Sequence, residues 1–73
     1  MTIISQTEIE VSRGRVQKTH VYHDGKYYVI SENPQETLIF PSDSKGKHSY
    51  LEVGSALHTS EAILMIQNGQ IMS

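Results

Sequence analysis

Histidines are the residues of this chain best suited to metal chemistry, and His20 and His23 form an HxxH spacing. Residues three apart share one face of a helix but point to opposite faces of a strand. The segment around this pair is rich in β-forming residues, and His48 and His58 lie in distant segments. We therefore expect no metal site and no cofactor. His20 is predicted to be a partly buried, hydrogen-bonded residue and His23 a surface residue beside a turn.

Motifs for covalent catalysis or phosphate binding are weak. The chain has no cysteine, and none of its serines lies in a strained turn of the GxSxG type. No pair of carboxylates has a reason to be buried together, so we expect that the protein is not an enzyme. The sequence SKGK at 44–47 lacks the spacing of a phosphate-binding loop and a following helix. We expect a solvated loop there, although Lys45 and Lys47 could touch an acidic partner.

Length and charge narrow the class of protein. The 73 residues make one small domain, and a chain this short without disulfides often needs a second copy of itself for stability. Six basic and eight acidic residues give a net charge of −2, which argues against a nucleic-acid module. No apolar run approaches the roughly 20 residues that span a membrane, and the N-terminus does not resemble a secretory signal. We expect a cytoplasmic protein with no membrane partner, in the host-cell cytoplasm if it is phage-encoded.

Alternating β-forming residues predict an antiparallel meander over about residues 2–53. Asp24-Gly25 is a strong hairpin turn, Arg13-Gly14 is a second turn, and Pro34 and Pro41 end the later strands. A polar loop at 42–49 is expected to be mobile. The predicted strands are Thr2 to Ser12, Arg15 to His23, Lys26 to Glu32 and Thr37 to Phe40. Residues 50–53 are expected to form either a short fifth strand or an extended lead-in.

The C-terminal part changes to a helical period. Thr59 or Ser60 is a candidate N-terminal cap, and Asn68-Gly69 is a candidate end, so a helix is predicted over about 59–68. Such a short helix must pack on the sheet. The fold class is therefore α+β: a four- to five-stranded antiparallel β-meander with one short C-terminal helix on one face.

The two predicted turns set the register and divide the residues between two sheet faces. The first face, whose residues are listed at the end of this paragraph, is expected to be the core face on which the helix packs. Leu38 and Phe40 are expected to add to this core. The second is apolar around Val21, Tyr28 and Ile30, and Ile39 could extend it. The first face collects Ile9, Val11, Val16, His20, Tyr22, Tyr27 and Val29.

The second face supplies the candidate partner-binding site, because an apolar patch on the side away from a lone helix needs a cover. The alternative is a cover from the same chain, by Ile3-Ile4 or by residues 50–53. We expect a protein-interaction module that self-associates, most simply as a dimer, and that regulates or inhibits a larger complex in the manner of phage and mobile-element accessory proteins. The candidate residues are Val21, His23, Lys26, Tyr28, Ile30 and Ile39.

A nucleic-acid-binding sheet is the alternative function. Tyr28 would provide a stacking platform between basic residues, as in sheets that hold single strands. Glu8 and Glu10 lie in the same region and oppose this interpretation. The flanking cations would be Arg13, Arg15, Lys18 and Lys26.

Overall fold

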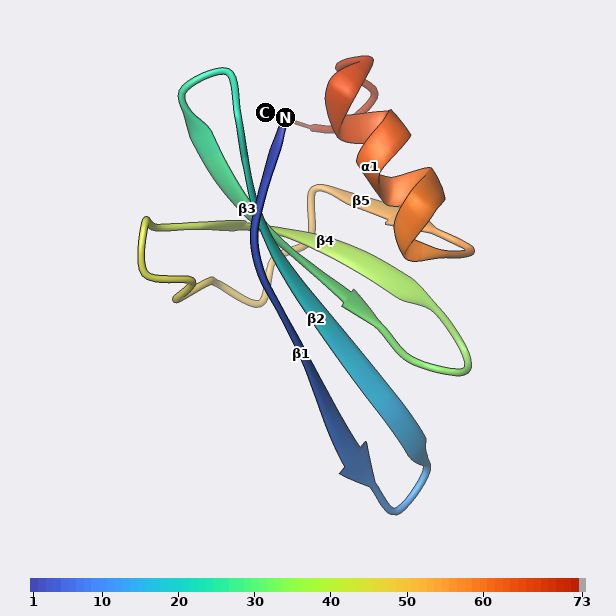
Figure 1. Ribbon diagram of the computed structural model, residues 1–73. Coiled ribbons are helices and arrows are strands. Elements are labelled where there is room, and N and C mark those ends of the chain that lie inside the picture. The colour runs from blue at the N-terminus through green and yellow to red at the C-terminus, as the bar shows by residue number, and fades with distance from the viewer. Residues whose placement is uncertain (73) are drawn as a thin grey trace.

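Residues 1–72 are described by a computed structural model, in which five antiparallel strands are followed by one helix (Figure 1). The strands lie in the order β1-β2-β3-β4-β5 in one open sheet, so each pairs with its neighbours in sequence. This arrangement confirms the predicted α+β meander. The elements are β1 (Thr2–Val11), β2 (Gly14–His23), β3 (Lys26–Glu32), β4 (Thr37–Ser42), β5 (Gly54–Ala56) and α1 (Thr59–Gln67).

The hairpin between β2 and β3 has the predicted register. His23 pairs with Lys26 across the Asp24-Gly25 turn, and the pairing continues to Gln17 and Glu32. Both turn residues have positive φ, 50° for Asp24 and 82° for Gly25, as a tight hairpin turn requires.

The hairpin between β1 and β2 turns one residue earlier than predicted. Val11 pairs with Gly14, so Ser12 and Arg13 form the turn, and the predicted Arg13-Gly14 turn is wrong. Gly14 is needed for a different reason: its φ is +128°, and a Cβ there would lie 2.8 Å from Cγ of Pro34. Partners along the hairpin move by two residues, which leaves the predicted facing of each strand unchanged.

The end of the sheet differs from the prediction at β4 and β5. β4 continues through Pro41, because β5 pairs only with Thr37–Ile39 and leaves that part of β4 at the sheet edge. The fifth strand is Gly54–Ala56, so the strand alternative for 50–53 is wrong. Gly54 admits close packing, since a Cβ there would come within 3.2 Å of both Ile39 and Ile71.

Helix α1 agrees with the predicted range but begins differently. His58 is the N-cap residue and makes no side-chain capping bond, so the predicted cap by Thr59 or Ser60 is wrong. The C-terminal end matches the Asn-Gly signal. Gly69 has a φ of 69°, its N–H donates to the Ile66 carbonyl, and the next N–H donates to the Met65 carbonyl.

The helix packs on the second sheet face, so the predicted seat of the helix is wrong. Ala62 and Ile66 bury themselves against a floor that includes the fully buried Ile30 and Ile39. The opposite face includes the polar His20, which needs a hydrogen-bonding cover. Figure 1 shows α1 on one side of the sheet and the segment between β4 and β5 on the other.

Candidate functional site

The six residues predicted to bind a partner do not form an exposed patch. Val21, Ile30 and Ile39 have no exposed surface, and Tyr28 is 8% exposed. They form the core beneath Ala62 of α1, so this face is covered by the chain's own helix and not by a second chain. A base cannot stack on the buried Tyr28 ring, and the nucleic-acid alternative therefore loses its platform.

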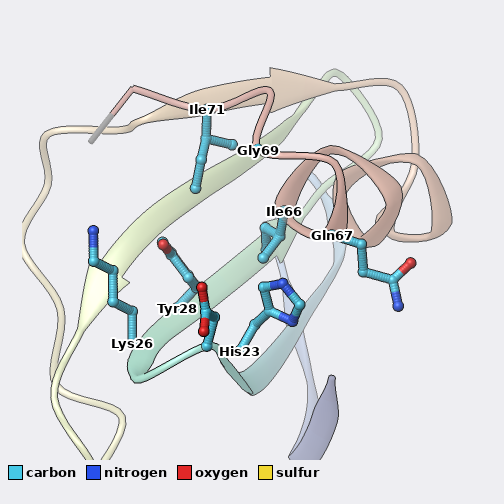
Figure 2. Close-up of a pocket in the computed structure, with 8 residues that line it drawn as sticks. His23, Lys26, Tyr28, Ile66, Gln67, Gly69 and Ile71 are labelled. Atoms are coloured by element: carbon cyan, nitrogen blue, oxygen red, sulfur yellow. The ribbon is translucent and has the colours of Figure 1, made fainter.

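The other two predicted residues, His23 and Lys26, line a polar pocket of about 290 Å³ between the β2–β3 turn and the end of α1 (Figure 2). Asp24, Tyr28 and Gln67 also line it. Burial raises the pKa of the Tyr28 phenol above 10.0, and the Asp24 charge raises it further. The phenol is therefore a neutral hydrogen-bonding group and a poor nucleophile at neutral pH.

The opposite face is covered by the loop that follows β4. His20 is 8% exposed, and its Nε2 lies 3.1 Å from the Asp43 carbonyl oxygen. The predicted hydrogen bond is confirmed, and the residue is more fully buried than the predicted partial burial. The His48 ring stacks on Phe40 with 4.7 Å between ring centroids. His23 lies on the other face, beside the helix, as the register predicted. Within residues 1–72, no cluster of three metal-ligating side chains occurs.

Asp43 organises this loop, a role that the sequence reasoning missed. Its Oδ1 accepts hydrogen bonds from the backbone N–H groups of Lys45 at 2.9 Å and Lys47 at 3.0 Å. These two amides, led by that of Lys47, hold the pKa of the Asp43 carboxyl below its ordinary value. An aspartate followed by a serine and, three positions later, by a glycine is a turn signal, and it could have predicted these hydrogen bonds within the loop. Mobility of the loop stays a prediction.

Glu32 provides the missing N-terminal cap of α1 from the end of β3. Its Oε1 accepts a 2.6 Å hydrogen bond from the Thr59 hydroxyl and a longer one, 3.4 Å, from the Thr59 N–H. His58 Nδ1 lies 3.5 Å from the other carboxylate oxygen. The Thr59 hydroxyl is the main reason that the pKa of Glu32 is lowered. The carboxylate therefore ties the sheet to the positive end of the helix dipole.

The largest unpartnered feature is β1 itself. It is the edge strand of the sheet, all ten of its residues are exposed, and it extends with β2 away from the helix (Figure 1). The face that was predicted to be the core is open here: Ile9 and Val11 are each 49% exposed. Tyr22, also predicted to point inward, is 37% exposed. Within residues 1–72, Val29 and Phe40 are the only buried apolar residues on that face.

The charged side of the same hairpin is partly neutralised within the chain. Arg15 lies 3.6 Å from Glu8 and 3.4 Å from Glu10, on the face opposite Ile9 and Val11. Such exposed pairs add little stability. They do reduce the negative charge along the edge strand, which matters for any chain that approaches it.

The fold and this exposed edge define a class: a small α+β domain with an open five-stranded meander. Comparison with protein-family models, with curated proteins and with solved structures gives no match. In the described part of the chain, no helix has the length and apolar character needed to cross a membrane.

Proposed function

We propose that this protein is a small non-catalytic protein-binding module that acts by self-association through β1. The observation that supports this proposal is a ten-residue edge strand whose residues are all exposed. In the proposed dimer, two copies join their sheets edge to edge, so that β1 of each chain gains the backbone partner that it lacks.

An exposed edge strand carries a row of unpaired N–H and C=O groups and is a template for another strand. Proteins that keep such an edge monomeric block it with charged side chains, above all lysine, or with proline, a bulge or a covering segment. β1 contains no lysine or proline, and its two charged residues, Glu8 and Glu10, are both paired with Arg15. Its one register irregularity lies between Ile3 and Ser5, which leaves the stretch from Ser5 to Val11 regular. The edge therefore has little protection over most of its length.

The apolar residues beside this edge add to the argument. Ile3 and Ile4 are 50% and 46% exposed, at one end of β1, and Ile9 and Val11 lie at the other end. An antiparallel dimer brings the N-terminal end of one β1 beside the C-terminal end of the other and covers part of this apolar surface. Ile3, paired with Val21, lies on the helix side of the sheet, and Ile9, paired with Val16, lies on the other side. Burial of apolar area is favourable by about 25 cal/mol per Å².

Charge selects the antiparallel arrangement over the parallel one. A parallel pair would place Glu8 beside Glu8 and Glu10 beside Glu10, and like charges opposite each other destabilise a sheet. In the antiparallel pair, the two glutamates of each strand lie beside the uncharged N-terminal half of the other. This symmetry also favours a closed dimer over an open chain. A regulatory role toward a larger complex stays a prediction.

The test uses the direction of the backbone amides in β1. Val11 and Gly14 flank a two-residue turn, so they pair by backbone hydrogen bonds and the alternate residues, including Glu8, direct their N–H groups outward. Glu8→Pro removes one outward N–H while leaving the β1–β2 ladder intact. Glu8→Ala is the matched control, because it removes the same carboxylate and keeps the N–H.

Sedimentation velocity over a concentration series measures the outcome. We expect the wild type and Glu8→Ala to dimerise and Glu8→Pro to remain monomeric, with unchanged far-ultraviolet circular dichroism in all three. A wild type that stays monomeric at the highest soluble concentration contradicts the proposal, as does a proline variant that dimerises like the wild type.

A further inference from the structure

A second pocket lies on the loop side of the sheet, where the loop after β4 meets the first three strands. Its volume is about 170 Å³. We propose that this pocket binds a phosphate group, independently of self-association. The residues that line it are Ser5, Thr7, Lys18, His20, Val29, Lys45 and Gly46.

The charge of the lining selects an anion. Lys18 and Lys45 both line the pocket, and no carboxylate does. Lys18 is half-buried, and neither lysine has a carboxylate oxygen within 4 Å in residues 1–72. An anion that enters the pocket therefore gains an interaction with two ammonium groups that the protein itself does not neutralise.

The polar lining also fits the oxygens of a phosphate. The hydroxyls of Ser5 and Thr7 can donate hydrogen bonds beside the two ammonium groups, and lysine is an established point-charge partner of phosphate. Pockets for drug-sized ligands occupy about 300–1,000 Å³. A pocket of about 170 Å³ is too small for such a molecule and suits a single tetrahedral group.

The fold holds Lys45 at this position through His20, a positioning residue. The Asp43 carbonyl can only accept, so the Nε2 of His20 carries the proton and donates it across 3.1 Å. Gly46 lies flat against the same ring: its φ is +88°, and a Cβ there would be 3.4 Å from the His20 Nδ1. The Asp43 carboxylate already accepts hydrogen bonds from two loop amides through Oδ1.

This arrangement gives the SKGK sequence a context that its spacing did not predict. The motif lacks the helix that follows an ordinary phosphate-binding loop, and here the second cation comes from β2 instead. The backbone N–H of Gly46 donates to the Asp43 carbonyl at 3.2 Å, so side chains must supply the donors.

The experiment is a titration of the ¹⁵N-labelled protein with inorganic phosphate, followed by amide chemical shifts at constant ionic strength set with chloride. We expect saturable shifts at Thr7, Lys18, Lys45 and Gly46. Lys18→Gln and Lys45→Gln should each weaken binding roughly tenfold, since each removes one charged partner of the anion. The matched control is Lys26→Gln, which makes the same charge change at the pocket on the other face and should leave affinity unchanged.

Three outcomes overturn the proposal: shifts that do not saturate, saturable shifts that lie elsewhere, or equal weakening by Lys26→Gln. A second titration, with phosphoserine, identifies the source of the group. Tighter binding of phosphoserine than of inorganic phosphate indicates a phosphorylated side chain, and equal or weaker binding indicates the free ion. Retained dispersion of the amide spectrum shows that each glutamine variant is folded.

Discussion

Replacement of Glu32 should loosen the attachment of α1 to the sheet. The carboxylate is the only side-chain acceptor that the structure gives the first turn of the helix in residues 1–72, through the Thr59 hydroxyl and N–H. Glu32→Ala removes both hydrogen bonds, and Glu32→Gln keeps an oxygen acceptor but loses the charge. Glu36→Gln is the matched control, because it neutralises a nearby exposed glutamate whose carboxylate makes no contact with the helix.

The magnitude follows from the geometry. A hydrogen bond to a charged group contributes about 1.5–3 kcal/mol, and loss of a helix cap costs about 0.5–2 kcal/mol. The Glu32 side chain is 28% exposed, and the N–H contact is long at 3.4 Å, so the lower part of these ranges applies. We expect a loss of about 1–2 kcal/mol for Glu32→Ala and about 1 kcal/mol for Glu32→Gln. Each kcal/mol lowers the Tm of a domain this size by roughly 4–8 °C.

The same interaction predicts a pH dependence. The Thr59 hydroxyl lowers the pKa of Glu32 from 4.5 in the folded state, so the carboxylate stabilises the fold fully above that value. This contribution is lost as the pH falls through the lowered folded-state pKa. In urea unfolding from about pH 7 to about pH 3, the stability difference between wild type and Glu32→Gln should be constant at first and then shrink.

Two results would refute this reasoning. One is a Glu32→Ala variant as stable as Glu36→Gln at neutral pH. The other is a difference between wild type and Glu32→Gln that does not change on acidification. Thr59→Ala, introduced into the wild type and into Glu32→Ala, completes a double-mutant cycle that isolates the interaction between Glu32 and Thr59. The coupling energy between the two sites should be about 1 kcal/mol.

Three further predictions concern the core and the loop. Ile66→Ala should destabilise the protein by about 2–5 kcal/mol in urea unfolding, because Ile66 is 3% exposed in the core; a loss below about 1 kcal/mol would contradict the helix position. Asp43→Ala should speed hydrogen exchange at the Lys45 and Lys47 amides, measured by nuclear magnetic resonance, and unchanged exchange rates would count against its role. In an ultraviolet pH titration, the transition that Tyr28→Phe removes should lie above pH 10.0, since burial raises the pKa of the Tyr28 phenol; removal of a transition below that pH would contradict this.

The sequence was most informative where short-range chemistry decides the structure. Asp24-Gly25 supplies two residues that tolerate positive φ, and this alone determines the β2–β3 register and the opposite facing of His20 and His23. The Asn68-Gly69 end of the helix follows from the same conformational preference.

The choice of sheet face for the helix could not be read from the pattern. Both faces carry apolar residues, and the decision depends on what covers each of them. The loop after β4 supplies a carbonyl for His20 and a ring for Phe40, which leaves the face with Ile30 and Ile39 for α1. The contact of His20 with Asp43 and those of α1 with Ile30 and Ile39 join residues more than 20 positions apart, and residue spacing does not report them.

The candidate site shifted for the same reason. The predicted patch around Tyr28 is part of the core, and the exposed edge is β1, which the sequence predicted only as a strand. A strand with alternating apolar and polar residues has the same sequence pattern whether it lies in the centre or at the edge of a sheet. Only the strand order reveals that β1 has one open side.

The most direct test of edge-to-edge pairing is an isotope-filtered nuclear Overhauser experiment on a mixture of labelled and unlabelled protein. Antiparallel strands bring α-protons of facing residues close together at alternate positions. We predict intermolecular contacts between α-protons of Ser5 to Val11 in the two chains, and their loss in Glu8→Pro. Intermolecular contacts that arise from another surface, or none in a wild type that sediments as a dimer, would contradict association through β1.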